Sequence, residues 1–315
     1  MKLAVATQRV DLDDPVLGAT VPKLQALAER VERLVVLTLH EGKHDLPENV
    51  RVRTLSSTRR GARGIRFAAA LAAERPDAML AHMAPVYAVL AAPFGAPVAL
   101  WFTHPRDSRL LRIATRLSRV VLTVDERSFP FGSPKVRAIG HGIDVDRFRC
   151  VARAPREPLR LLALGRFSRV KRYDLIERAV HRVGGVEAEF VGPVLSDADR
   201  AYRASLAHTR DAVRWRDVPD LFAGYDALVS ATEAGSADKA IFEAAAACLP
   251  VVASAPALAS LLPAELRFAD EDGLVERLEW LKAADRRALG AELRERVVRD
   301  HSVATWADRV VEALQ

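Results

Sequence analysis

Short apolar runs rich in β-branched residues recur along the first half of the chain, and segments with helix-like spacing lie between them. The runs cover residues 1–7, 34–39, 78–82, 97–102 and 120–124, whereas residues 21–31 and 65–73 repeat apolar side chains at helical intervals. Short apolar runs are typical of buried strands, and helical spacing is typical of a helix with one buried face. This alternation predicts βα units around a parallel sheet that is covered on both faces.

The same pattern starts again after a polar, proline-bearing stretch at residues 153–158, which we interpret as an interdomain linker. In the second half, residues 159–164, 188–191, 227–230 and 251–254 are the expected strands, and residues 173–183, 240–247 and 285–300 are the expected helices. A chain of 315 residues also suits two cores better than one. The pattern therefore predicts an α/β protein with two Rossmann-like, doubly wound domains, at residues 1–150 and 157–300, facing across a cleft.

Composition excludes a disordered or fibrous protein, because half of the residues are apolar and 28% are charged. The most apolar stretch, residues 87–102, is interrupted by proline and glycine and is shorter than a spanning helix requires. Polar side chains soon interrupt the first apolar run, so no secretory leader is expected. Cys150 and Cys248 lie far apart in sequence, and neither zinc nor a disulfide framework is expected from them. A reducing, cytoplasmic location fits these features.

The net charge of +6 leaves three classes of partner open: nucleic acid, an anionic membrane surface and an anionic small substrate. The densest basic cluster, residues 59–66, contains Arg59, Arg60, Arg63 and Arg66 at the start of an alanine-rich segment. It lacks interleaved aromatic side chains, so we expect no nucleic acid partner. Two interpretations of the cluster stay open: a solvated loop and helix start, or peripheral contact with the inner membrane face or an acidic acceptor.

The first segment with recognisable chemistry follows the strand at residues 159–164 and runs into a helix. It contains Gly165, Arg166 and Lys171. Glycine lets the backbone turn tightly, arginine offers a planar fork of donors, and lysine supplies a compact charge, which together suit a diphosphate. Fixed cations would stabilise a diphosphate leaving group as its bond to a sugar breaks. An ordinary basic surface loop is the alternative.

The second such segment, residues 229–254, joins a small-residue loop to an alanine-rich helix and a further apolar run. Free N–H groups at the start of a helix bind anions. A glutamate inside the helix, Glu243, can accept hydrogen bonds from two adjacent sugar hydroxyls. The structural alternative is an ordinary capped helix in the core, which explains the alanines but not the complete sequence of residues 229–254. The loop residues expected at the donor are Gly235, Ser236, Ala237, Asp238 and Lys239.

In the first half, three residues follow expected strands. Gly18 lies between the first strand and a helix, and His82 and His104 stand at or just beyond the ends of later strands. Because the carboxyl ends of parallel strands face the ligand, a substrate contact is expected for His104, and the same positional logic applies to His82. A structural role is the alternative for both. Gly140 and Gly142 flank His141 and permit positive φ angles at a tight crossing toward the linker.

These segments together resemble the retaining glycosyltransferases of family 4, over nearly the whole chain. Residues 164–176 resemble the family's Gly-Arg-Leu…Lys-Gly motif, with Arg172 where glycine is usual. Residues 229–252 resemble its Glu-Gly…Glu-Ala-Met-Ala-Cys-Gly-Leu-Pro-Val-Val block, and residues 133–148 resemble the Lys-Val…Asn-Gly-Val-Asp…Phe ending of the first domain. The resemblance implies the GT-B fold, a nucleotide-diphosphate-sugar donor with uridine or guanosine as base, and transfer of a hexose-like sugar with retention.

The resemblance also implies roles for the donor residues. In the family, the residues that match Arg166 and Lys171 contact the donor diphosphate, and the residue that matches Glu243 holds the ribose. The family's other motif glutamate would fall on Gly235. Either the loop carries a short insertion and Glu233 performs this role, or the contact with the donor sugar is altered.

In the first domain, His104 matches the family's histidine beside the transferred sugar, and Gly18 is what remains of a richer glycine loop near the donor phosphates. The resemblance further implies that a C-terminal helix, residues 303–315, packs back on this acceptor-binding domain. The expected catalytic residues are thus His104, Arg166, Lys171 and Glu233.

The implied reaction uses no cofactor and no metal ion, and the acceptor is a glycan, a lipid or a small metabolite. Two enzymatic alternatives share the architecture: a nucleotide-sugar epimerase, which needs no acceptor, and a phosphorylase, which needs free phosphate. A third alternative is a nucleotide-sugar-binding protein that has lost transfer, since the glycine loop is thin and Glu233 is displaced. A nucleic-acid-binding function would rest on charge alone.

Overall fold

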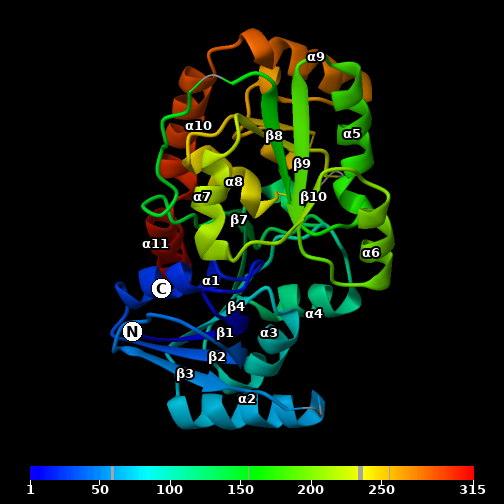
Figure 1. Ribbon diagram of the computed structural model, residues 1–315. Coiled ribbons are helices and arrows are strands. Elements are labelled where there is room, and N and C mark those ends of the chain that lie inside the picture. The colour runs from blue at the N-terminus through cyan, green and yellow to red at the C-terminus, as the bar shows by residue number, and fades with distance from the viewer. Residues whose placement is uncertain (58–59, 155, 233–236, 255) are drawn as a thin grey trace. The chain divides into compact units, whose positions relative to one another are not determined.

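The computed structural model describes residues 1–57, 60–154, 156–232, 237–254 and 256–315. It divides into two compact units (Figure 1). Unit 1 comprises Met1–Gly142 and Ser302–Gln315, and unit 2 comprises Ile143–His301. Each unit contains one parallel sheet with helices on it, which confirms the predicted α/β class with two Rossmann-like domains.

Unit 1 is built on a seven-stranded sheet in the order β3-β2-β1-β4-β5-β6-β7, and every neighbouring pair is parallel. The central strands β4 and β5 are buried at every position, as expected for a sheet covered on both faces. The strands are β1 (Lys2–Val10), β2 (Arg33–Glu41), β3 (Val50–Thr54), β4 (Ala78–His82), β5 (Val98–Trp101), β6 (Val120–Thr123) and β7 (Val136–Ala138).

Two sets of helices cover this sheet. Residues of α2, α3 and α4 share one apolar cluster with strand residues and therefore lie on one face. Helix α1 packs against α11, which also contacts β5, so the C-terminal helix belongs to unit 1. None of the helices in the described part of the chain is long and apolar enough to cross a membrane. The helices are α1 (Thr20–Ala28), α2 (Arg60–Glu74), α3 (Pro85–Ala91), α4 (Arg109–Leu117) and α11 (Val303–Leu314).

Unit 2 has a five-stranded parallel sheet in the order β10-β9-β8-β11-β12. Its strands are β8 (Leu159–Leu164), β9 (Val186–Gly192), β10 (Thr209–Asp211), β11 (Ala227–Ser230) and β12 (Val251–Ala253). Its helices are α5 (Tyr173–Arg182), α6 (Asp197–Ala204), α7 (Val218–Ala223), α8 (Lys239–Ala246), α9 (Glu271–Ala283) and α10 (Arg286–His301).

The apolar pattern did not reveal three strands: β3, β7 and β10. Their sequences are Val-Arg-Val-Arg-Thr, Val-Arg-Ala and Thr-Arg-Asp, and each lies at an edge of its sheet. An edge strand buries few side chains, so its sequence lacks the apolar run that marks a central strand.

The stretch interpreted as a linker is docked on unit 2. The guanidinium of Arg153 donates to the main-chain oxygens of Cys248 and Ala247, each at 3.2 Å, and burial lowers its pKa. The unit boundary lies earlier, at Gly142, where Gly140 and Gly142 have φ angles of +83° and +76° as the glycine pattern predicted. The stretch at residues 153–158 therefore belongs to unit 2, which begins at Ile143.

The expectation that the cysteines form no disulfide is wrong. Cys150 and Cys248 are joined, with their Cα atoms 4.9 Å apart. The segment that precedes Cys150 runs along unit 2, because the N–H of Ile143 donates to the carbonyl of His301 and the ring of Phe148 packs against Trp215. This course brings Cys150 to the end of α8, which spacing along the sequence could not show.

Candidate functional site

The carboxyl ends of β8 and β11 bring together the two chemistry-bearing segments of unit 2. The strands are parallel neighbours, with Leu161 opposite Ala227, so the chain leaves both at the same edge of the sheet. The ammonium nitrogen of Lys171, after β8, lies 2.6 Å from a carboxylate oxygen of Asp238, before α8. Residues that the sequence analysis assigned to one site thus meet in space.

Gly165 shapes the turn at the end of β8. Its φ is +150°, and its carbonyl accepts a hydrogen bond of 2.9 Å from the Tyr173 hydroxyl. A Cβ on Gly192, the last residue of β9, would overlap the carbonyl oxygen of Gly165. Both glycines are therefore needed for this close approach. Gly192 is not among the residues predicted for the site, although it directly follows an expected strand.

Lys171 does not point freely into solvent. Its partner oxygen, Oδ2 of Asp238, also accepts a 2.6 Å hydrogen bond from the Thr232 hydroxyl, which lies 3.0 Å from the Ser230 hydroxyl. The side chains of Lys171 and Asp238 are each 17% exposed. A bound anion would have to compete with the Asp238 carboxylate for Lys171.

Arg166 is held more loosely. Its side chain is half exposed, and its Nε lies 3.8 Å from the carboxylate of Asp199, near the start of α6. That carboxylate also accepts a hydrogen bond of 3.1 Å from the N–H of Leu195. Although Asp199 is buried, a pair at this distance with a half-exposed arginine is weak, so the fork of Arg166 is available to an anionic ligand.

Arg172, where the family resemblance expects glycine, occupies a left-handed backbone position with φ +48° and ψ +43°. Side chains with a Cβ adopt this region at a cost of about 1 kcal/mol. We expect Arg172→Gly to stabilise unit 2 by up to about 1 kcal/mol in urea unfolding, and Arg172→Ala to give no such gain. A loss of stability in the glycine variant would contradict this view of the turn.

Glu243 is buried, with 2% exposure, one turn inside α8. Its Oε1 accepts a 2.6 Å hydrogen bond from the indole N–H of Trp215 and lies 3.0 Å from the ammonium of Lys239. The ammonium of Lys239 also lies 5.6 Å from the centroid of the Trp215 ring. The carboxylate is thus fixed by two donors, and Lys239, expected at a phosphate, is paired with it. No motif in the sequence pointed to Trp215.

Three predicted site residues, Glu233, Gly235 and Ser236, lie outside the described residues. Ala237, the next described residue, is buried and directly precedes Asp238. The substitution of Glu233 for the family's first motif glutamate therefore stays a prediction.

In unit 1, Gly18 and His104 follow β1 and β5. The N–H of Gly18 donates to the carbonyl of Asp14 at 3.1 Å, so Gly18 closes its own loop. His104 is exposed, and its Nδ1 accepts a 3.0 Å hydrogen bond from the N–H of Arg106. Its position beyond the strand end agrees with a ligand contact, but its role stays a prediction.

His82, at the end of β4, is buried in an aromatic and cationic cluster. Its ring stacks on Trp101 with 6.4 Å between centroids, and its Nδ1 lies 3.3 Å from the Thr7 hydroxyl. The ammonium of Lys23 lies 5.1 Å from the centroid of the Trp101 ring and 5.2 Å from that of Trp306, on α11. Burial, and then the charge of Lys23, hold the pKa of His82 well below its usual value. His82 is therefore neutral at pH 7. Its ring packs in the interior of unit 1, between Thr7 on β1 and Trp101 on β5.

This shift predicts the pH dependence of stability. Between its lowered folded pKa and its unfolded pKa near 6.5, His82 takes up a proton only on unfolding. The free energy of unfolding should therefore fall as pH drops below about 6.5, by up to about 1.4 kcal/mol per pH unit from this residue. In urea unfolding from pH 8 to 5, His82→Gln should flatten this slope, whereas His181→Gln, at an exposed position, should leave it unchanged. If the slope of unfolding free energy against pH is unchanged in His82→Gln, then His82 is not the source of this pH dependence.

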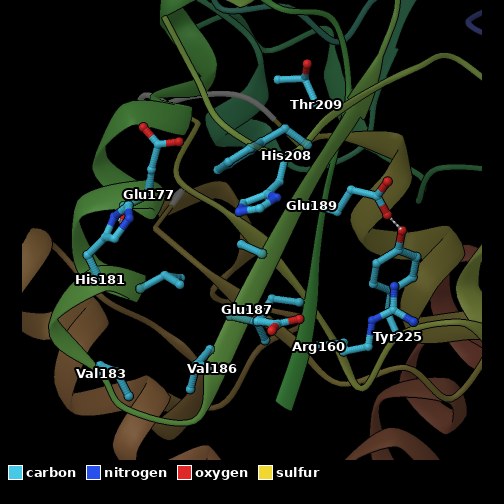
Figure 2. Close-up of a pocket in the computed structure, with 14 residues that line it drawn as sticks. Arg160, Glu177, His181, Val183, Val186, Glu187, Glu189, His208, Thr209 and Tyr225 are labelled. Atoms are coloured by element: carbon cyan, nitrogen blue, oxygen red, sulfur yellow. Dashed lines mark hydrogen bonds between the residues drawn. The ribbon is translucent and has the colours of Figure 1, made fainter. Parts of the chain in front are cut away.

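A pocket with a volume of about 620 Å³ opens on unit 2, but it contains none of the predicted site residues. It lies alongside β9 between α5 and the start of β10, away from the carboxyl ends of the strands (Figure 2). Glu177 and His181 line it from α5, and Tyr225 donates to Glu189 on β9. Burial, and then this hydrogen bond, raise the pKa of Tyr225 to about 12. The pocket is thus distinct from the Lys171–Asp238 edge.

Part of the sequence matches a protein-family model, and the fold resembles those of several solved structures. Residues 171–312, less than half of the chain, match the family model described as glycosyl transferase-like. The sequence has no significant match among curated proteins. The fold resembles that of HepE from Anabaena, solved with UDP and glucose, with a TM-score of 0.78, 16% identity and coverage of 100% of this chain and 99% of that chain.

Two further structures share the fold. Sucrose-phosphate synthase from Thermosynechococcus elongatus has a TM-score of 0.77 and 16% identity over 99% of this chain and 98% of that chain. UDP-GlcNAc 2-epimerase from Methanocaldococcus jannaschii has a TM-score of 0.59 and 11% identity over 100% of this chain and 99% of that chain. The chain thus has the GT-B fold of glycosyltransferases and carries a glycosyl transferase-like region over residues 171–312.

Proposed function

We propose that the protein is a retaining glycosyltransferase of family 4, which moves a hexose-like sugar from a UDP- or GDP-sugar to a hydroxyl of a glycan, lipid or small-molecule acceptor. The observation that carries the proposal is the meeting of Lys171, Arg166 and the start of α8 at one edge of the unit 2 sheet. Two cations and a helix start are suited to a diphosphate. HepE, of the same fold, was solved with UDP and glucose.

Each donor residue has a role in this proposal. Lys171 leaves Asp238 to bind the diphosphate, and the exposed fork of Arg166 binds it from the β8 side. The amides of Ala237, Asp238 and Lys239 face the phosphates at the start of α8. Glu243, held by Trp215, accepts hydrogen bonds from the ribose hydroxyls through its remaining lone pairs. Gly165 keeps side-chain atoms away from the phosphates.

In the proposed reaction, the acceptor oxygen attacks the anomeric carbon on the face that the diphosphate leaves. The bond between that carbon and the diphosphate oxygen breaks, and its electron pair stays on the diphosphate, where Arg166 and Lys171 stabilise the charge. The acceptor proton passes to a donor phosphate oxygen. His104 and Glu233 are the proposed contacts of the transferred sugar, and Gly18 shapes the loop near the phosphates. No metal ion or cofactor has a part in this scheme.

A second candidate function is nucleotide-sugar binding without transfer. It is favoured by the pairing of both expected diphosphate cations with carboxylates, Arg166 with Asp199 and Lys171 with Asp238. An epimerase on the same fold is a third candidate, because the M. jannaschii epimerase shares it.

Release of nucleoside diphosphate distinguishes these candidates. The protein is incubated with UDP- and GDP-sugars, with pooled glycan, lipid and small-molecule acceptors, and with or without a chelator. A transferase should release nucleoside diphosphate faster with one acceptor, and the rate should persist with the chelator. An interconverted sugar nucleotide without release would favour an epimerase, and binding without turnover would favour the inactive protein. A rate restored only by a divalent metal would contradict the metal-independent scheme.

A further inference from the structure

Helix α4 of unit 1 exposes an apolar stripe. Leu110, Ile113 and Leu117 are 43%, 46% and 47% exposed. They are three and four positions apart and therefore share one edge of the helix. The neighbouring edge, with Leu111 and Ala114, is buried against the core of unit 1. Isolated exposed aliphatic side chains are common, but three on one edge of a nine-residue helix form a continuous apolar strip.

The stripe is bordered by arginines. The helix and its flanking residues, 104–119, contain one acidic residue, Asp107, and five arginines: Arg106, Arg109, Arg112, Arg116 and Arg119. Asp107 is paired with Arg112, whose Nε lies 3.0 Å and 3.1 Å from its two carboxylate oxygens. Within the described part of the chain, the other four arginines form no ion pair. This surface therefore presents uncompensated positive charge beside apolar side chains.

The helix is firmly held, so the exposure does not come from a frayed end. The Ser108 hydroxyl accepts a 3.1 Å hydrogen bond from the N–H of Leu111 and caps the start of α4. The ammonium of Lys135 donates to the carbonyls of Arg116 and Ser118, at 2.6 and 2.7 Å, at its other end. Such caps order both termini of the helix.

The basic cluster noted in the sequence, residues 59–66, is less suited to contact with a partner. At the start of α2, Arg63 donates to the carbonyl of Ser57 at 2.7 Å and Arg66 donates to that of Ser56, while Arg59 lies outside the described residues. These two guanidinium groups are used to tie down their own loop. Helix α2 also exposes only one large apolar side chain among those described, Ile65.

We propose that α4 binds the surface of an anionic phospholipid bilayer. Leu110, Ile113 and Leu117 enter the boundary between headgroups and acyl chains, and the arginines beside them contact lipid phosphates. A helix with an apolar edge and a basic flank lies in the plane of such an interface, and anionic headgroups attract the flank. Nucleic acid would match the charge but leave the aliphatic stripe in water. The proposal is independent of the donor site in unit 2.

Vesicle sedimentation tests the proposal. The full chain is mixed with phosphatidylcholine vesicles, or with vesicles in which phosphatidylglycerol replaces part of that lipid, at low and high salt. Binding should require phosphatidylglycerol and weaken with salt. Ile113→Asp should lower the partition coefficient by about tenfold or more, because it places a charge in the apolar stripe. Arg109→Glu/Arg116→Glu should lower it at least as far, whereas Arg109→Lys/Arg116→Lys should keep most of it.

Val298→Asp is the matched control, since Val298 is a 41% exposed aliphatic residue on α10 of unit 2 and its change should leave partitioning unaltered. Ile113→Trp gives a second measurement, because its added fluorescence should be quenched by lipids brominated on their acyl chains. Equal binding of native protein and Ile113→Asp overturns the proposal, as does absence of binding to phosphatidylglycerol vesicles. Self-association that Ile113→Asp abolishes, without vesicle binding, would identify a second copy of the chain as the occupant.

Discussion

Lys171→Ala is expected to lower kcat/KM for the nucleotide sugar by about a hundredfold or more. The side chain supplies a compact charge beside Asp238, which directly precedes α8, and removal of one group that stabilises charge in a transition state costs about that much. The loss should appear mainly in kcat, since negative charge develops on the diphosphate only as the bond to the sugar breaks. The measurement is initial rate against donor concentration.

Two variants serve as controls for this prediction. Arg169→Ala removes an exposed cation from the same turn, and we expect it to keep nearly native activity. Asp238→Asn keeps Lys171 but removes its competing carboxylate, so diphosphate affinity should rise by several-fold. If Asp238→Asn is as inactive as Lys171→Ala, then Asp238 itself contacts the donor and the competition proposed between Asp238 and diphosphate is wrong.

Trp215→Ala should destabilise unit 2 by about 3–5 kcal/mol, the usual cost of deleting a large buried side chain. Trp215 is 1% exposed, its ring packs against Phe148, and the Arg147 guanidinium lies 5.0 Å from its centroid. Urea unfolding measures the loss directly.

Trp215→Phe separates packing from hydrogen bonding. It keeps most of the buried ring but removes the N–H that donates to the Glu243 carboxylate, so it should cost about 1.5–3 kcal/mol, the range for a hydrogen bond to a charged group. Nucleoside diphosphate should also bind more weakly because, among the described residues, Glu243 is then held by Lys239 alone. A phenylalanine variant with native stability and affinity would show that this hydrogen bond orients nothing.

The sequence predicted the parts of the fold that are buried and repetitive. Central strands such as β4 and β8 are mostly apolar, so their positions were recovered almost without error. Edge strands such as β3 do not carry this signal, because arginines alternate along them. The expectation of no disulfide was wrong for a different reason. Cys150 reaches Cys248 only because residues 143–150 run along unit 2, and the spacing of the two cysteines in the sequence does not show this.

The candidate site was predictable where residue type alone limits the chemistry. Gly165, Arg166 and Lys171 follow a strand in order, so the sequence predicts that they share one anion site, and the structure brings Lys171 to Asp238. What spacing could not show is which side chains neutralise or fix these groups. The partners Asp199, in α6, and Trp215, just before α7, come from other parts of the chain, and only the folded chain places them beside Arg166 and Glu243.

The central claim is that the edge of unit 2 around Lys171 binds a nucleoside diphosphate. A thermal-shift panel of UDP, GDP, ADP and the matching monophosphates tests it most directly, because a ligand that binds only the folded state raises its stability. One diphosphate at saturating concentration should raise the unfolding midpoint by about 5 °C, and its monophosphate by much less. The shift should disappear in Arg166→Ala and shrink in Glu243→Gln. No shift from any nucleotide, or an equal shift in both variants, would contradict the assignment of this edge as the donor site.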